Sequence, residues 1–264
     1  MGELVRLERD GAVARMVLVR PEAGNAINFE FARRLRELAE TCASDPSIRA
    51  VLITSEGKAF CVGGDLSAFS AVAGTQRTVL LRNIADEFHT AQLRLLTMPK
   101  PLIVAVQGAV AGAGLGLALL GDLVVASSSA QFTSAYTTVG LSADGGTTYL
   151  LPRLIGMRRA QQLLLTDRRL SAAEALEWGL VTDVVAPEAL AETAAALAGA
   201  MAAGPTSAYG VIRRLLLTSL TNDFASQTRE EGGHIARLAA GADASEGFSA
   251  FFGKRRPVFT GVEA

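Results

Sequence analysis

Cysteine and histidine are scarce in this chain of 264 residues, with two of each. Cys42 and Cys61 match neither a metal-binding spacing nor the disulfide framework of a small secreted protein. Two histidines are too few for an imidazole-rich metal site, so we expect no bound metal. Residues 1–10 are charged and lack an apolar core, so we expect no signal peptide and a cytoplasmic location.

The chain also has little net charge, because 25 lysines and arginines face 26 acidic residues. This balance gives no electrostatic reason to expect a nucleic-acid partner or binding to an anionic membrane surface. Half of the residues are apolar and 19% are charged, which is typical of a folded globular protein. The length allows one large domain, or one domain with an appendage, around a substantial core.

Apolar periodicity predicts a mixed first part and a helical last part. Residues 4–8 and 12–19 alternate around Asp10-Gly11, which indicates a β-hairpin. Ser171 and Glu174 form a capping-box pattern, with Gly179 at the expected end of that helix. From residue 187 onward only helices are expected, so we divide the chain into 1–186 and 187–264. The other predicted strands are 48–54, 102–106, 123–126 and 131–133, and the predicted helices are 29–43, 78–96, 187–203, 205–220, 223–240 and 243–252.

The most informative stretch is PKPLIVAVQGAVAGAGLGLALLGD, residues 99–122. Its β-branched apolar run predicts a buried strand, and the glycines that follow allow the backbone to approach a ligand closely before a helix begins. The free N–H groups at such a helix start favour negative charge. We therefore expect this turn to hold an anion, including one that exists only in a transition state.

Other interpretations fit parts of this stretch. Residues 101–121 contain no charge and carry overlapping GxxxG patterns, as a membrane span can, although the flanking sequence is that of a globular domain. A dinucleotide fingerprint fails because Leu117 stands where its third glycine belongs, and a phosphate loop fails for want of Gly-Lys-Ser/Thr. A packed strand-turn-helix without chemistry remains an alternative.

Two other glycine pairs adjoin aspartates, Gly63-Gly64 before Asp65 and Gly145-Gly146 after Asp144. Aspartate is a favoured helix N-cap, so each aspartate has a structural as well as a functional interpretation. His89 lies in the predicted helix 78–96, and taken alone it is more typical of a packed or solvated histidine than of a catalytic one.

These motifs together resemble the crotonase family, the enoyl-CoA hydratases and isomerases. The segments are KAFCVGGDL (58–66), GAVAGAGLGLALLGDLVVAS (108–127), AQF (130–132) and ADGGTTYLLPRLIG (143–156). The resemblance covers nearly the whole chain and is closest to the enoyl and ring-epoxide isomerases of phenylacetyl-CoA breakdown. It implies an α/β fold, a crotonase-like spiral of repeated ββα units with a C-terminal helical trimerisation region, and assembly into trimers or hexamers.

The resemblance also implies an acyl-CoA thioester substrate, with coenzyme A as part of the substrate and no further cofactor. The family polarises the thioester carbonyl with two backbone N–H groups, which would belong here to Val62 and Ala113. Lys254, in the basic tail, would meet the nucleotide end of CoA from a neighbouring subunit. The other implied substrate- and CoA-binding residues are Ala23, Ala26, Ala59, Gly63, Gly64, Asp65, Leu66, Val110, Gly114, Tyr136 and Leu141.

The acid–base residues depart from the hydratase pattern, because Gly116 and Tyr136 stand where hydratases carry glutamates. Asp144 remains, at a position where some isomerases of the family carry their catalytic aspartate, and neighbours such as Leu141 are expected to raise its pKa. We therefore expect a 3-enoyl-CoA to 2-enoyl-CoA isomerase with Asp144 as proton shuttle. The alternatives are a hydratase that uses Asp144, a non-catalytic acyl-CoA-binding protein, and an aryl-CoA dehalogenase in which Asp144 and His89 match the nucleophile and base.

Overall fold

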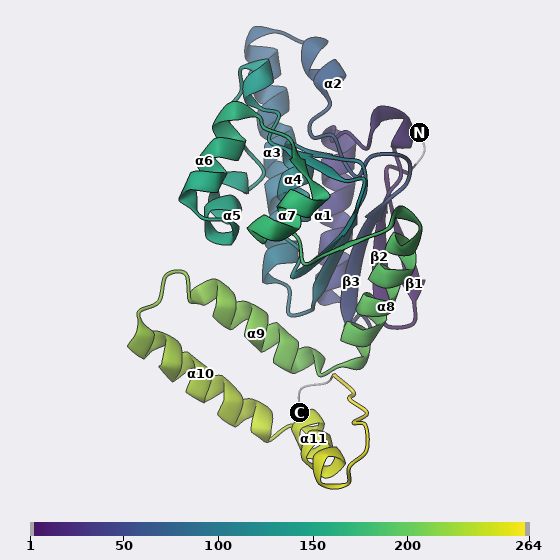
Figure 1. Ribbon diagram of the computed structural model, residues 1–264, viewed down its shortest axis with the longest axis vertical. Coiled ribbons are helices and arrows are strands. Elements are labelled where there is room, and N and C mark those ends of the chain that lie inside the picture. Colours follow the sequence, from purple (N-terminus) through teal and green to yellow (C-terminus); the bar gives the residue numbers. More distant parts are fainter. Residues whose placement is uncertain (1–2, 262–264) are drawn as a thin grey trace.

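The computed structural model describes residues 3–261, and its centre is a six-stranded sheet in the order β1-β2-β3-β4-β6-β9 (Figure 1). β1 and β2 form the predicted antiparallel hairpin, and every other neighbouring pair in this sheet is parallel. Parallel neighbours require crossover connections, which accounts for the long segments between these strands. The strands are β1 (Val5–Asp10), β2 (Val13–Leu18), β3 (Ala50–Ser55), β4 (Leu102–Val106), β6 (Leu123–Ser127) and β9 (Asp183–Val185).

Both faces of this sheet are covered by helices. On β3, Val51 and Ile53 face the core that contains α1 (Phe29–Ser44) and α3 (Gly74–Thr97), whereas Ala50 and Leu52 face α8 (Leu190–Ala203). Strands buried on both faces appear as continuous apolar runs in the sequence. α3 begins before the predicted residue 78, and its length allows it to span from the sheet to the site described below.

A second sheet contains three short strands in the order β5-β7-β8. Its strands are β5 (Ala109–Ala111), β7 (Gln131–Thr133) and β8 (Leu170–Ser171). β5 was not predicted, because it follows β4 after only Gln107 and Gly108. Gly108 has φ +56°, and a Cβ there would come within 1.8 Å of the Lys58 carbonyl oxygen, so only glycine permits this change of direction.

Short helices lie in the connections within and between the two sheets, and several of the predicted caps are confirmed. Asp65 accepts hydrogen bonds from the N–H groups of Ser67 and Ala68 at the start of α2. Ser171 and Glu174 form the capping box of α7, which ends at Gly179 in the left-handed conformation. The short helices are α2 (Leu66–Ser70), α4 (Ala113–Ala118), α5 (Thr147–Leu154), α6 (Met157–Thr166) and α7 (Ala172–Trp178).

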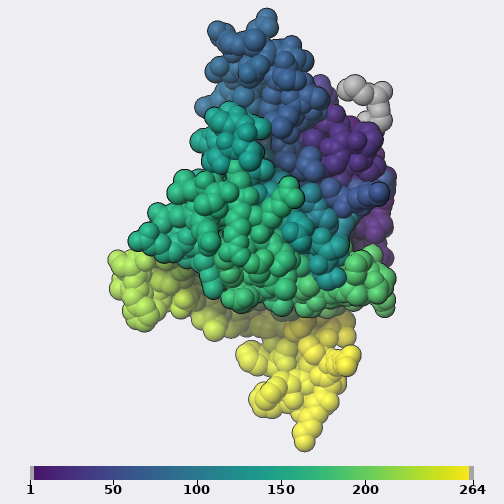
Figure 2. All heavy atoms as spheres, turned by 45° about the horizontal axis from the view of Figure 1, so that its top comes forward, coloured from purple at the N-terminus to yellow at the C-terminus, as the bar shows by residue number. Residues whose placement is uncertain are grey.

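The C-terminal part is helical, as predicted, and the last helix extends away from the sheet (Figures 1 and 2). α8 packs on the central sheet through Ala194 and Ala198, whereas α9 (Thr206–Thr218) and α10 (Phe224–Ala239) form a hairpin, followed by α11 (Ala242–Phe252). The expected division at residue 186 stays a prediction, and it separates α8 from strands against which it packs.

The membrane-span interpretation of residues 101–121 is wrong. This stretch is divided among β4, β5 and α4, and none of the helices within residues 3–261 is long and apolar enough to cross a bilayer.

Candidate active site

Two glycine turns meet at the start of α4. Gly63 has φ +99°, and a Cβ there would lie 3.1 Å from the Ala111 carbonyl oxygen and 3.4 Å from the Ala113 nitrogen. Gly112, the residue before α4, has φ +52°. Glycine is needed here because the two backbones approach closely and because other residues rarely adopt these positive φ angles.

Backbone N–H groups at this junction are candidates to hold an anion. Within residues 3–261, neither the Ala113 N–H nor the Gly64 N–H has a hydrogen-bond acceptor. Gly64 and Ile27 form a parallel bridge. In this bridge the Ile27 N–H donates to the Gly63 carbonyl oxygen and the Asp65 N–H donates to the Ile27 carbonyl oxygen, so the Gly64 N–H is not used. α4 has only six residues, so these individual N–H groups, rather than a helix macrodipole, would hold an anion.

The prediction that the Val62 N–H is one of the two donors is wrong. Its N–H donates to the Gly24 carbonyl oxygen at 3.0 Å and is thus already used within the fold. Gly64, two residues further on, has an N–H without an acceptor within residues 3–261, and we assign it as the donor together with Ala113.

A cavity of about 540 Å³ opens at the two free N–H groups. Its walls are mainly apolar and come from α2, α3 and the segment 135–144. The predicted site residues that line it are Val62, Gly63, Gly64, Leu66, Ala113, Tyr136, Leu141 and Asp144, and apolar neighbours that were not predicted include Phe69, Leu81, Ile84, Phe88 and Val139.

The remaining predicted residues lie outside this cavity: Ala23, Ala26, Ala59, Asp65, Val110, Gly114 and Lys254. Asp65 is 6% exposed, and besides capping α2 it forms an ion pair with Arg20 at 2.7 Å. Its carboxylate is thus occupied by the protein itself. Val110 is buried in β5, and Gly114 is packed so closely against the Cys61 carbonyl oxygen that a Cβ would come within 2.4 Å of it.

Asp144 lies in the wall of the cavity and contacts His89, which projects from α3. The Asp144 Oδ1 atom is 2.5 Å from His89 Nε2 and accepts a hydrogen bond from the Gly145 N–H at 2.5 Å. Both side chains are about half-exposed. Within the described part of the chain, Oδ2 has no hydrogen-bond partner, so one carboxylate oxygen is held and the other is free.

The cap interpretation of Asp144 is wrong. α5 begins at Thr147, its N-cap residue is Gly146, and no side chain caps it. The Asp144 backbone carbonyl accepts hydrogen bonds from the Thr147 hydroxyl at 2.8 Å and the Tyr136 hydroxyl at 3.0 Å. These bonds fix the turn and leave the carboxylate uninvolved in helix capping.

The expected rise of the Asp144 pKa is also wrong. Burial does raise the pKa of this carboxyl, but the hydrogen bonds from His89 and Gly145 and the positive charge of His89 outweigh burial and hold it below its ordinary value. The hydrogen bond to Asp144 is in turn the largest cause of a raised His89 pKa. Near neutral pH, Asp144 is therefore an ionised carboxylate, ready to accept a proton.

The structure explains why residue 116 is glycine. A Cβ on Gly116 would lie 2.1 Å from the Gly145 carbonyl oxygen, so the Asp144-Gly145 turn fills the space that a side chain would need. Tyr136, at the other hydratase glutamate position, lines the cavity and fixes the same turn through its hydroxyl group. No carboxylate substitutes for the two glutamates at these positions.

Two residues of α3 contact the Asp144-Gly145 turn. The sequence left the role of His89, the partner of Asp144, open, and it did not indicate Gln92, the partner of Gly145. Their separation by three positions predicts a shared helix face. It could not show that the face meets a turn 53 and 55 residues further along the chain.

The sequence profile described as Enoyl-CoA hydratase/isomerase matches residues 8–262. A 1,2-epoxyphenylacetyl-CoA isomerase of Escherichia coli (strain K12) is 38% identical over 261 residues, which are 99% of this chain and 100% of that protein. A probable enoyl-CoA hydratase of Rhodobacter capsulatus is 35% identical and covers 97% of this chain and 98% of its own length. The crystal structure of a protein from Mycobacterium abscessus, titled an enoyl-CoA hydratase/isomerase, superimposes with TM-score 0.94 at 35% identity, covering 98% of this chain and 100% of that one.

The fold and the site thus define an enzyme of the crotonase type. The chain belongs to the enoyl-CoA hydratase/isomerase family, and the expected α/β, crotonase-like fold is confirmed, whereas trimerisation through the C-terminal helices stays a prediction.

Proposed function

We propose that this enzyme is an acyl-CoA isomerase that converts a 3-enoyl-CoA into a 2-enoyl-CoA, with Asp144 as the proton carrier. One observation carries the proposal: a single ionised carboxylate lies in the wall of an apolar cavity that also contains two free backbone N–H groups. The high similarity to an isomerase that acts on a CoA thioester supports it.

The proposed reaction uses Asp144 twice. Its free Oδ2 takes the proton from C2, the electron pair of that C–H bond forms a double bond between C1 and C2, and the carbonyl π pair moves to the thioester oxygen, giving a dienolate. The N–H groups of Gly64 and Ala113 stabilise the charge on that oxygen. The protonated carboxyl group then returns its proton to C4, so that the double bond ends between C2 and C3. The lowered pKa of Asp144 makes it a weaker base but a stronger acid for this second step.

Hydration is the second candidate, and the geometry disfavours it. Water addition needs one group to activate water and another to protonate carbon, each contributing about 10²–10⁴-fold. Asp144 is the only aspartate or glutamate that lines the cavity within residues 3–261. The place beside Gly116 is filled by the Gly145 carbonyl group.

The experiment that tests the proposal is a substrate panel with product identification. The panel contains 3-enoyl, 2-enoyl, aryl-acetyl and halogenated aryl CoA esters, and a parallel measurement follows deuterium exchange at C2 in D₂O. Isomerisation of the 3-enoyl ester, with exchange at C2, would support the proposal. Fast hydration of crotonyl-CoA, release of halide, or binding without turnover would replace it by the hydratase, the dehalogenase or the binding protein, respectively.

The packing at Gly116 yields a first prediction. Gly116→Ala places a methyl group against the Gly145 carbonyl, so the turn must shift at a cost of about 1–3 kcal/mol of folding free energy. We expect isomerisation to fall about 10-fold because Asp144 moves with the turn. Gly199→Ala on α8, where a Cβ meets nothing within 4 Å, is the matched control. Steady-state rates and thermal unfolding check both variants, and an unchanged rate in Gly116→Ala would contradict this account.

The bound CoA is proposed to extend along Ala23, Ala26, Ala59 and Leu66, and Lys254 is proposed to reach the nucleotide end from a neighbouring subunit. The assembly that this requires is a trimer or hexamer, with the hexamer preferred.

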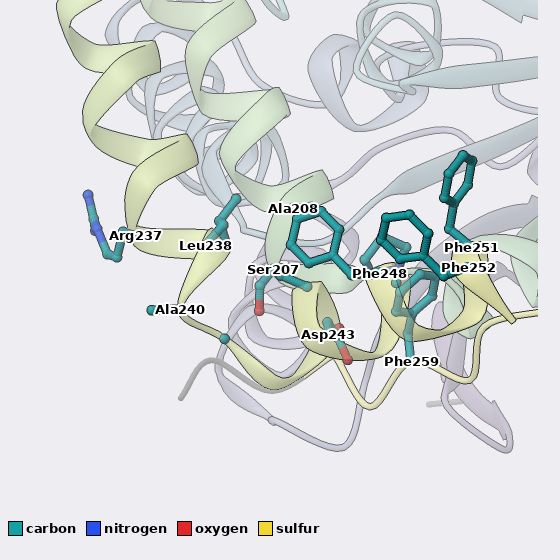
Figure 3. A pocket seen from close by; sticks show the side chains of 14 residues that line it. Ser207, Ala208, Arg237, Leu238, Ala240, Asp243, Phe248, Phe251, Phe252 and Phe259 are labelled. Carbon is teal, nitrogen blue, oxygen red and sulfur yellow. The ribbon is translucent and has the colours of Figure 1, made fainter.

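Four phenylalanines, Phe248, Phe251, Phe252 and Phe259, gather at a second cavity of about 760 Å³ beside α11 (Figure 3). Phe251 and Phe252 are 77% and 79% exposed, which is unusual for a surface that faces water.

We therefore predict that light scattering at micromolar concentration gives the mass of a trimer or hexamer. Covering these rings with a second copy of the chain removes a large apolar area from water, which is the expected driving force. A monomer mass at that concentration would contradict the prediction.

A further inference from the structure

α3 contacts the Asp144-Gly145 turn at two positions of one face. His89 contacts the Asp144 carboxylate, and Gln92 donates from Nε2 to the Gly145 carbonyl oxygen at 2.9 Å. Gln92 is 6% exposed, which is unusual for an amide side chain in the middle of a helix. A buried amide is retained where it has a specific partner, and here that partner is the backbone next to Asp144.

Gly145 is closely surrounded by other residues. It has φ +61°, and a Cβ there would come within 3.3 Å of the Phe88 ring and 3.4 Å of the Ala113 Cα atom. Its carbonyl oxygen lies over Gly116, and its N–H donates to Asp144 Oδ1. Within residues 3–261, Gln92 supplies the side-chain hydrogen bond to that carbonyl, so it holds the peptide unit next to the one whose N–H reaches Asp144.

We propose that Gln92 is a positioning residue of the acid–base site: it holds the Gly145 carbonyl and thereby keeps the Asp144 carboxylate against His89, with Oδ2 left free. The effect on rate rests on the proposed isomerase function. The effect on the contact between Asp144 and His89 does not, so the two are tested separately.

The first readout is the titration of His89 by NMR. The chain has only two histidines, so the ring signals of His89 and His234 are readily assigned. The charged groups that affect His89 are Asp144 from the turn and Asp86 and Arg82 from α3, and the bond to Asp144 is the largest cause of its raised pKa. In Gln92→Met, which keeps the length but loses the donor, the His89 pKa should fall toward its ordinary value of 6.5.

The second readout is the isomerisation rate. In Gln92→Met we expect kcat to fall at least about 10-fold, since small misplacements of a reacting group cost up to about 10²-fold, while KM stays within about twofold. Gln107→Met is the matched control, because Gln107 also donates to a backbone carbonyl, that of Ser55 at 3.0 Å, but does not line the cavity. It should leave both the His89 pKa and kcat unchanged.

Gln92→Asn keeps the amide but is too short to reach Gly145, and it replaces Gln92→Met if that variant does not fold. A His89 pKa and a kcat equal to those of the unaltered protein would overturn the proposal. If the unaltered protein does not isomerise a 3-enoyl-CoA, the proposed function fails, and the His89 titration still decides whether Gln92 positions Asp144.

Discussion

Replacing Asp144 by asparagine is expected to lower the isomerisation of a 3-enoyl-CoA by at least about 10²-fold, which corresponds to about 2.7 kcal/mol in the transition state. Asparagine has nearly the same shape and can still accept a hydrogen bond from the Gly145 N–H, but it cannot carry a proton. The loss should appear in kcat, because the cavity that binds the acyl group is unchanged.

Deuterium exchange at C2 is the decisive measurement for this variant. Exchange reports proton removal alone, so it should disappear together with isomerisation while CoA esters still bind. Asp183→Asn on β9 is a suitable control, since Asp183 is exposed and lies outside the cavity. If Asp144→Asn isomerises at the original rate, the proton carrier is another group and the proposed mechanism is wrong.

The pH dependence of the unaltered enzyme follows from the same contacts. A carboxyl whose pKa is held below its ordinary value stays ionised as the pH falls to about 4, so activity that depends on it is retained over the mildly acidic range. The raised His89 pKa keeps that ring charged further toward neutral pH, so the ion pair with Asp144 weakens as the pH rises through the His89 pKa and also as it falls through the Asp144 pKa.

Most of the fold could be predicted from the sequence, because local patterns specify it. The hairpin around Gly11, the strand before Gly108 and the cap at Asp65 each depend on residues a few positions apart. β5 was missed because it follows β4 after only Gln107 and Gly108, so no long connection separates the two strands in the sequence. Its partner β7, which was predicted, gives no local indication of β5.

The site was predicted in its composition and missed in its details. The motifs indicated two donors and one carboxylate, but which N–H groups are free depends on contacts with distant backbone. The Val62 N–H donates to the carbonyl oxygen of Gly24, a residue outside the motif that contains Val62. The sign of the Asp144 pKa shift depends on His89, which lies 55 residues away. Neither contact can be predicted from the spacing of residues within a motif.

Removing the Ala113 N–H with proline is expected to lower kcat by about 10²–10³-fold, the usual effect of losing one oxyanion-hole donor. Ala113 is the first residue of α4, where proline is well tolerated because its nitrogen has no partner within the helix. Ala113→Pro should therefore fold, and within residues 3–261 it removes an N–H that bonds to nothing in the protein.

Ala113→Gly is the matched variant, because it removes the methyl group and keeps the donor. We expect it to retain most of the isomerase activity, so that the difference between the two variants measures the N–H itself. Circular dichroism and thermal unfolding should establish that both are folded before their kcat values are compared. If folded Ala113→Pro keeps full activity, the dienolate oxygen does not rest on Ala113, and the stabilising donors must be sought elsewhere around the cavity.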